Sequence, residues 1–449
     1  MSRILHIGFR IFDRIITWTT LKFTKPGLFV LSVLVISGAL GVDTNLTVAY
    51  KLFTFLAAIL GISFLWCIGF KPRISVKRSL PRLATAGQKF DYRIVFQNLS
   101  EKSLRGLYFK ECIRTVFPTR EEFERNPEPD EAYRNIFDRT VRYHRWAWLS
   151  SLKRGVTPKN FPLPLLPPHS VRETLSELLP LQRGRINIDG ITIFRPDPFG
   201  LVNAYATIPA PESIAVLPRL YPIPGASISG SRQYTQGGES LAVSVGNSEE
   251  YLSLRDYQPG DPLRNIHWKA CAKTGSIIVK ERQDEFFIRC GLILDTFHES
   301  DYSVVFEEAV SVAASFISWM EDQESLLDLM FIGSKAQFFT SGRGIDHAVA
   351  LLEILASVTP NRKEPFSSLA SLVYNRAPLL SSCICVLLAW DDQRKDLIRI
   401  LKCLGIPVTV IIVIAKNAPP INDPKTMEEL NGRFYVFEAG KVEQGLARA

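Results

Sequence analysis

Two charge-free apolar runs lie near the start of the chain, at Pro26–Val42 and Leu52–Phe70. Each is about as long as a helix that crosses a bilayer, the first at the short limit. Basic residues precede and follow the pair, whereas the segment between them, Asp43–Tyr50, contains neither lysine nor arginine. The pattern predicts two transmembrane helices within residues 26–71, with both chain ends on the cytoplasmic side.

Apolar and basic positions alternate in residues 1–25, where Arg3, Arg10 and Arg14 lie between isoleucines and phenylalanines. This pattern is typical of an amphipathic helix on an anionic membrane surface. It is equally typical of a basic flank that merely orients the apolar helices that follow. The sequence leaves both interpretations open.

Short runs of alternating apolar and polar residues follow, separated by turn signals, and they indicate antiparallel strands. We interpret residues 72–224 as a β-sandwich domain. A charged and aromatic stretch that becomes proline-rich interrupts the alternation at 114–170, and we interpret it as a partly helical insertion. A glycine- and serine-rich linker and a short motif fill residues 225–286.

In residues 287–449, uniformly apolar runs such as Cys383–Trp390 alternate with amphipathic helical patterns. This alternation predicts a mostly parallel sheet covered by helices on both faces, which is a doubly wound α/β domain. The expected fold class is therefore α/β plus β, with an N-terminal transmembrane helical hairpin, a β-sandwich and a C-terminal doubly wound domain.

Composition and charge alter this picture little. A hydrophobic content of 46% and a mean hydropathy of +0.07 fit a globular chain that also carries membrane helices. The basic flanks largely account for the net charge of +8, so we expect no nucleic-acid partner. The seven cysteines form no C-x-x-C pair, which indicates buried thiols in a reducing compartment.

A short motif within Tyr251–Gly275 has the form L-R-x-Y-x-P-G-D-x-x-R-x-I-x-W-x-A. Its Pro-Gly pair fits a tight turn, Asp261 is placed to cap a following helix, and Gly275 is placed to end it. Its residue types dominate protein-binding hot spots, so we interpret it as a docking surface. The alternative is an internal brace of mixed charge. The residues assigned to this interaction motif are Arg255, Tyr257, Pro259, Gly260, Asp261, Arg264, Trp268 and Lys273.

This motif resembles the signature of the bacterial domain-of-unknown-function family 58. The stretch Asp197–Leu201 and a strand ending in Asp295 also agree with that family, and the strand resembles the first strand of a von Willebrand factor A domain. The resemblance implies a multi-pass protein of the plasma (inner) membrane. It also implies partnership with an AAA+ ATPase of the MoxR type in the assembly or maturation of other proteins.

Von Willebrand A domains that bind a divalent ion use an Asp-x-Ser-x-Ser loop, whereas this chain has Asp295-Thr296-Phe297-His298-Glu299. A phenyl ring cannot be a ligand, so we expect no metal and no cofactor, with a degenerate site at Asp295, Glu299 and Asp391. Asp391 is included because it follows a strand that ends at the same edge of the sheet. The alternative is a metal-dependent hydrolase or a metal-binding adhesion module centred on Asp295.

No phosphate-binding loop, nucleophile elbow or zincin motif occurs, and the six histidines are widely separated. We therefore expect a protein that is not an enzyme. The predicted function is a membrane-anchored scaffold or adaptor at the cytoplasmic face. Its expected partners are the AAA+ ATPase, other membrane or cytoplasmic proteins and the lipid bilayer.

Overall fold

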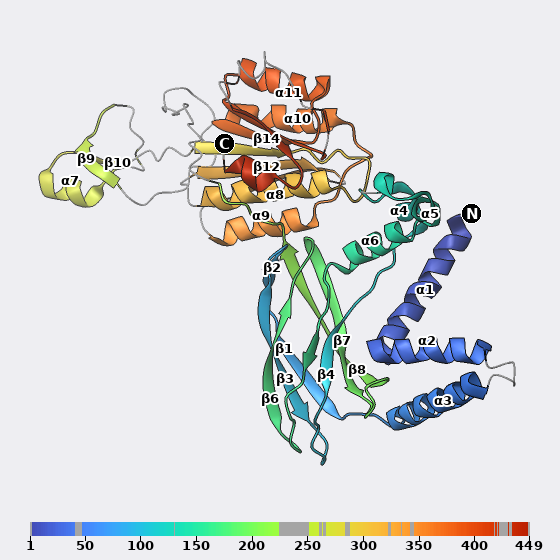
Figure 1. Ribbon diagram of the computed structural model, residues 1–449. Helices are drawn as coiled ribbons and strands as arrows, with labels where there is room; N and C mark the ends of the chain where they lie inside the picture. The colour runs from blue at the N-terminus through green and yellow to red at the C-terminus, as the bar shows by residue number, and fades with distance from the viewer. Residues whose placement is uncertain are drawn as a thin grey trace.

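The computed structural model in Figure 1 describes residues 2–40, 47–129, 131–223, 251–259, 263, 266–282, 288–321, 325–333, 335–341, 345–416, 418, 419, 421, 430 and 433–447. N-terminal helices lead into two facing sheets with a helical insertion, then a small hairpin unit and a larger sheet covered by helices. The expectation of mixed helix and sheet, with several separate sheets, is confirmed.

Three helices open the chain: α1 (Ser2–Lys22), α2 (Lys25–Leu40) and α3 (Thr47–Cys67). Within the described residues, Val48–Cys67 is the one helical stretch long and apolar enough to cross a membrane, with a mean hydropathy of 2.0. Helix α2 is apolar but has 16 residues, which at 1.5 Å per residue is shorter than a hydrocarbon core of about 30 Å. Among the described residues, one helix is of spanning length where the sequence predicted two, and residues 41–46, which follow α2, lie outside them.

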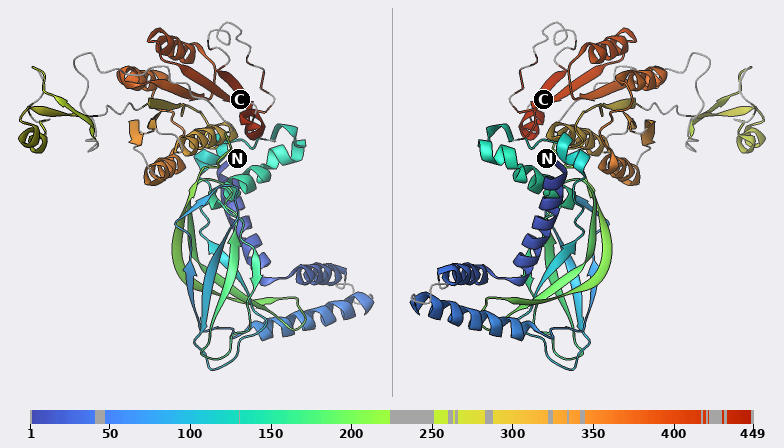
Figure 2. Two further views of the ribbon diagram at one scale, coloured as in Figure 1. Left: turned by 90° about the vertical axis from the view of Figure 1, so that its left-hand side faces the viewer. Right: turned by 90° about the vertical axis from the view of Figure 1, so that its right-hand side faces the viewer.

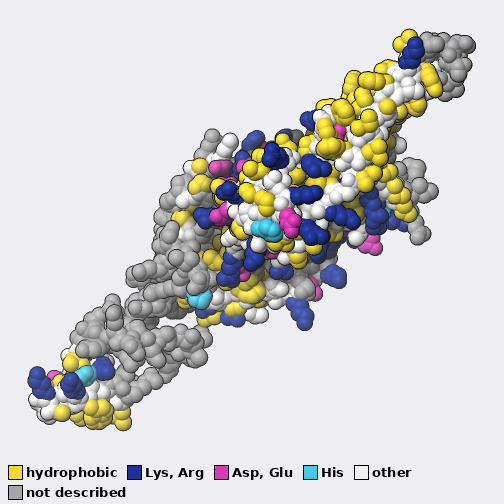
Figure 3. All heavy atoms as spheres, turned by 90° about the horizontal axis from the view of Figure 1, so that it is seen from below, with side chains coloured by type: hydrophobic (Ala, Val, Ile, Leu, Met, Phe, Trp, Pro, Cys, Tyr) yellow, Lys and Arg dark blue, Asp and Glu magenta, His cyan; other side chains and the backbone are white. Residues whose placement is uncertain are grey.

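Helices α2 and α3 lie side by side and project from the rest of the molecule (Figures 1 and 2). The phenyl ring of Phe53 packs against Gly38, where a Cβ atom would lie 3.1 Å from the ring carbons. Hydrophobic side chains cover the projecting pair, and lysine and arginine side chains gather on the surface next to its base (Figure 3). This distribution is typical of helices that leave a charged surface to enter lipid.

Two sheets face one another below the α/β domain in Figure 1. One has the order β1-β3-β6 and the other β2-β8-β7-β4-β5. Their bounds are β1 (Ile74–Ser79), β2 (Leu83–Thr85), β3 (Phe90–Asn98), β4 (Tyr108–Ile113), β5 (Asn160–Pro162), β6 (Val171–Leu178), β7 (Gly184–Pro196) and β8 (Asn203–Leu217). Alternate residues of both sheets fill one core, including Phe96 and Phe109, whose ring centroids are 5.1 Å apart. The period-two alternation in the sequence reflects this shared core.

The stretch between β4 and β6 holds four helical segments: α4 (Arg120–Arg125), the 3-10 turn Glu131–Tyr133, α5 (Ile136–Val141) and α6 (Tyr143–Arg154). Thr119 and Glu122 form a reciprocal capping box that starts α4. Trp146 of α6 is fully buried and packs with Phe9 of α1 at 5.8 Å between ring centroids. The insertion is therefore partly helical, as predicted, and it is joined to the N-terminal helix.

A six-stranded sheet has the order β13-β12-β11-β14-β15-β16, parallel except for the edge strand β13. Its strands are β11 (Ile288–Leu294), β12 (Ser325–Ile332), β13 (Ala336–Ser341), β14 (Ser382–Leu387), β15 (Val408–Ile414) and β16 (Phe434–Glu438). One face carries α8 (Val304–Glu321), α9 (Ile345–Ser357) and α13 (Val442–Leu446), and the other carries α10 (Phe366–Arg376) and α11 (Asp392–Cys403). Cys383 and Cys385 are buried free thiols on one face of β14.

Polar contacts join the two-sheet unit to the α/β domain. Arg183 donates to Glu307 of α8 over 2.5 Å and to the carbonyl of Val358, and its guanidinium carbon lies 5.2 Å from the centre of the Phe306 ring. The backbone N–H of Tyr221 donates to Ser315 over 2.8 Å. Because Arg183 is buried, the Arg183–Glu307 ion pair is the charged centre of the junction.

Candidate functional site

Asp295 lies at the carboxyl edge of the six-stranded sheet, directly after β11. Strand β11 pairs with β12 on one side and with β14 on the other, so Asp295 is at the point where strand order reverses. Parallel sheets usually bind ligands at such a point. Asp295 is fully buried, and its carboxylate accepts hydrogen bonds from the N–H groups of Phe297 at 3.0 Å and Leu388 at 3.1 Å.

The guanidinium of Arg394, from helix α11, lies between two carboxylates at this edge. Its Nε donates to Asp295 over 2.6 Å, and its Nη1 donates to Asp391. Asp391 also caps α11 by accepting from the N–H of Arg394 at 3.0 Å. Burial opposes the charge of Arg394, but Asp295 and Asp391 outweigh it and raise the pKa of Arg394. An internal cation thus balances both acids.

The residues at this edge do not fit a divalent cation. Protein donors already engage both oxygens of Asp295. Phe297 packs on Phe366, with ring centroids 5.5 Å apart, so the loop supplies a phenyl ring where a ligand would be needed. Of the three residues predicted to form a degenerate site, Asp295 and Asp391 are joined through Arg394. The third, Glu299, is exposed to solvent. Among the described residues, no group of three His, Cys, Asp or Glu side chains could hold a metal.

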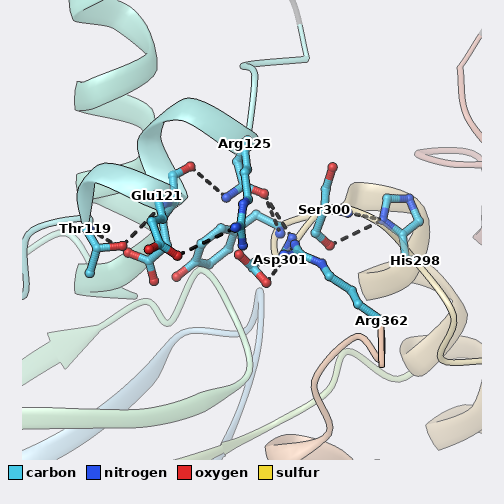
Figure 4. A network of polar contacts seen from close by, with 10 residues as sticks. Thr119, Glu121, Arg125, His298, Ser300, Asp301 and Arg362 are labelled. Carbon is cyan, nitrogen blue, oxygen red and sulfur yellow. Dashed lines mark hydrogen bonds and ion pairs between the residues drawn. The ribbon is translucent and has the colours of Figure 1, made fainter. Parts of the chain in front are cut away.

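The outer part of the same loop contacts the insertion (Figure 4). The side-chain oxygen of Asn126, at the end of α4, accepts from the N–H groups of Asp301 at 2.9 Å and Tyr302 at 3.4 Å. Arg362 pairs with Asp301 over 2.8 Å. The edge of the sheet where a ligand would bind is therefore a contact between two parts of this chain.

The signature motif forms a small unit of its own. Strand β9 (Tyr251–Asp256) pairs antiparallel with β10 (Ile278–Arg282), and helix α7 (Trp268–Thr274) lies between them in the sequence. Ile266 forms a β-bridge with Val279, and both are buried. Trp268 is 71% exposed and Leu263 is 70% exposed. The unit therefore buries a minimal core and presents large apolar side chains outward, of which Trp268 and Leu263 are the most exposed among its described residues.

Helix α7 of this unit begins at Trp268. His267 is the N-cap, and its ring accepts from the N–H of Ala270 over 3.0 Å. Asp261, the predicted cap, lies outside the described residues, as do Gly260 and Arg264. The prediction that Asp261 caps a helix is therefore not tested by the described residues. Gly275 ends the helix with a positive φ of 74°, as predicted.

Most other motif residues lie on the surface of the same unit. Arg255 and Tyr257 flank the end of β9 and are partly buried, while Pro259, Trp268 and Lys273 are exposed. The N–H of Tyr257 donates to the carbonyl of Ile277 over 2.9 Å, which extends the hairpin by one pair. The structure therefore brings these residues together on one scaffold.

The second family stretch, Asp197–Leu201, joins the apolar helices to the two-sheet unit. Asp197 accepts from the N–H groups of Leu201 at 2.6 Å and Val202 at 2.8 Å, and from the hydroxyl of Ser63 in α3 at 2.7 Å. Burial alone would raise the pKa of Asp197, but these hydrogen bonds hold it below its usual value. A Cβ atom on Gly27 would lie 1.9 Å from the carbonyl oxygen of Leu201, so only glycine allows α2 to approach this turn.

Sequence reasoning missed three residues that organise these sites: Arg394, Asn126 and Arg183. Each acts through a partner far away in the sequence: 99 positions for Arg394 and Asp295, 124 for Arg183 and Glu307, and 175 for Asn126 and Asp301. The spacing of Arg394 after Asp391, at the start of an amphipathic helix, was the one local signal for any of them. Long-range pairs of this kind leave no periodic pattern.

The geometry defines a modular protein in which a two-sheet unit connects an apolar helix to a sheet domain and a small exposed hairpin unit. Residues 253–418 match the family model described as "Protein of unknown function DUF58". This match over residues 253–418 confirms the resemblance recognised from the signature motif.

A relative, "Uncharacterized protein YeaD" of Bacillus subtilis (strain 168), is 24% identical over 242 residues. The match covers 54% of this chain and 59% of the relative, so it spans less than two thirds of that protein's length. A solution NMR structure and a crystal structure of the CARDB domain of PF1109 from Pyrococcus furiosus, the latter in complex with di-metal ions, were also matched. They share 12% and 13% identity, cover 32% of this chain and 94% and 93% of theirs, and have TM-scores of 0.17, which is too low to support an argument.

Proposed function

We propose that this protein is a membrane-anchored adaptor at the cytoplasmic face of the inner membrane, with both chain ends in the cytoplasm. Helix α3 is the anchor, and α2 is its shorter partner, so the pair forms a hairpin in the membrane. The two-sheet unit holds the hairpin through Asp197 and carries the α/β domain above it. Arginine and lysine residues on both flanks of the pair support this orientation.

The α/β domain is proposed to be a von Willebrand A-like domain whose metal loop has been replaced by an internal ion pair. Its strand order, with one antiparallel edge strand, supports the assignment. The Asp295–Arg394–Asp391 arrangement argues against the alternative of a metal-dependent hydrolase or a metal-binding adhesion module, because protein donors already engage both carboxylate oxygens of each acid. The domain then acts by binding proteins rather than by catalysis.

The observation that carries the adaptor proposal is the exposed apolar surface of the signature unit. Trp268 and Leu263 are large side chains of types that anchor protein interfaces, and Lys269 and Lys273 lie exposed next to them on α7. Singly exposed hydrophobic residues are common, but several on a unit with so small a core favour a partner. The proposed partner is an AAA+ ATPase of the MoxR type.

Replacing Trp268 by alanine is expected to weaken binding of the ATPase to the full-length protein in nanodiscs by about 30-fold or more, since truncating a hot-spot aromatic costs about 2 kcal/mol or more. Binding of the purified ATPase is measured by biolayer interferometry. Leu404→Ala, which removes an exposed apolar side chain from the α/β domain, is the matched control and should leave affinity unchanged. Equal affinities for wild type and the Trp268 variant would remove the signature unit from the interface.

A further inference from the structure

The helical insertion exposes three large apolar side chains at one end. Ile136 and Phe137, in the first turn of α5, are 82% and 73% exposed, and Tyr133, just before α5, is 79% exposed. These side chains add nothing to the insertion's own core, which is built around Phe123, Trp146 and Leu149. A cluster of this kind on a short surface helix indicates contact with another apolar phase or molecule.

Helix α1 carries a second exposed apolar stripe. Ile7, Ile11, Ile15 and Trp18 recur at helical spacing, and each is about half exposed. On the opposite side of α1, Phe9 is buried against the insertion. The stripe is therefore the part of α1 that the protein itself leaves uncovered.

The helix that carries the stripe contacts the insertion close to the end of α5. Phe12 of α1 contacts Tyr143, which follows α5, with ring centroids 5.5 Å apart. In Figures 1 and 2, α1 runs across the direction of α2 and α3, and the insertion helices lie beside its N-terminal end. A bilayer entered by α3 would then extend along α1 toward α5.

The charges around these regions complement anionic lipid. Arg10 and Arg14 lie exposed beside the stripe of α1, and Arg139 and Arg142 lie exposed at the end of α5. Apolar and aromatic side chains bordered by arginine are typical of helices that rest in the interface of an anionic membrane. A protein partner could bind either region without any relation to α3, whereas a bilayer entered by α3 would reach both.

We propose that α1 and the tip of the insertion, Tyr133–Phe137, form a second membrane contact, lying on the anionic lipid surface next to the anchor. The inference rests on the proposed anchoring by α3. The insertion thereby fixes the α/β domain at a set height and orientation over the membrane. Because Asn126 of the insertion also holds the loop after β11, this lipid contact and the α/β domain are connected through one short helix.

The test uses the full chain in nanodiscs with about 30% anionic lipid. A small fluorophore is placed at Ile11 or Phe137 by an unnatural amino acid, and quenching by lipids that carry a nitroxide near the headgroup is recorded. A label at Leu175, an exposed apolar position on β6, is the matched control. Quenching at positions 11 and 137, at least about twofold above that at 175, and reduced in zwitterionic lipid, is expected.

Flotation of the same preparations separates the inference from the anchor. If the chain floats with lipid but position 137 is quenched no more than 175, the second contact is wrong while the anchor stands, and the exposed tip belongs to a protein interface. Quenching at 11 alone also overturns it, because α1 would lie on lipid without the insertion. If the chain does not float, the anchor and the inference fail together.

Discussion

Replacing Arg394 by alanine is expected to lower the free energy of unfolding by about 3–5 kcal/mol, because a buried carboxylate loses its counter-ion. Asp295 is fully buried, and the two remaining backbone N–H donors cannot balance its charge. For a domain of this size the loss corresponds to a decrease of about 10 °C in Tm. Thermal unfolding of the full chain in detergent, followed by tryptophan fluorescence, measures it.

Arg399→Ala provides a matched control for this experiment. Arg399 lies on the same helix and pairs with Asp396 over 2.6 Å, but both side chains are more than half exposed. That pair is expected to contribute at most about 0.5 kcal/mol. A double variant, Asp295→Asn with Arg394→Met, should recover part of the loss, since both charges are removed together. Equal effects of Arg394→Ala and Arg399→Ala would mean that the internal cation has no structural role.

Replacing Arg183 by methionine is expected to cost about 2–3 kcal/mol and to loosen the junction between the two-sheet unit and the α/β domain. The variant removes the buried cation that donates to Glu307 and to the Val358 carbonyl. Backbone amides in the first two turns of α8 should then exchange with deuterium roughly tenfold faster or more. Hydrogen–deuterium exchange with mass spectrometry resolves this segment.

Arg219→Met tests whether burial, rather than bridging, makes this pair important. Arg219 also links the two-sheet side to the α/β domain, through Glu443 at 3.2 Å, but both side chains are more than half exposed. Its replacement should change stability by less than about 0.5 kcal/mol and leave exchange in α8 unaltered. If both variants accelerate exchange equally, the junction depends on net charge and not on the buried contact.

The strands and most helices could be predicted because they follow local periodicity. The apolar runs of the α/β domain lie in β11, β12, β14 and β15, where uniform hydrophobicity reflects burial on both faces. The pattern did not reveal β13, an edge strand of mixed composition, or the β9–β10 pair within the signature motif. Edge strands and two-stranded units bury few residues, so their sequences carry a weak signal.

The candidate sites were harder to predict than the fold. Asp295 and Asp391 were correctly placed at the same edge of the sheet because both follow parallel strands. That an arginine lies between them depends on how α11 packs, which no local pattern encodes. For the predicted span at Pro26–Val42, apolar composition correctly indicated a helix. It did not indicate that the start of α2 packs on the backbone of Leu201 through Gly27, because that contact joins residues far apart in the sequence.

The central claim, that the signature unit binds an AAA+ ATPase, is tested most directly by photocrosslinking from Leu263 in full-length protein within cells. A photoreactive residue at this exposed position is activated in the wild-type background and with Trp268→Ala, and products are identified by mass spectrometry. We expect a crosslink to a MoxR-type ATPase that the Trp268 variant loses while Tm is unchanged. Crosslinks confined to this chain's own α/β domain would contradict it and make the signature unit an internal brace.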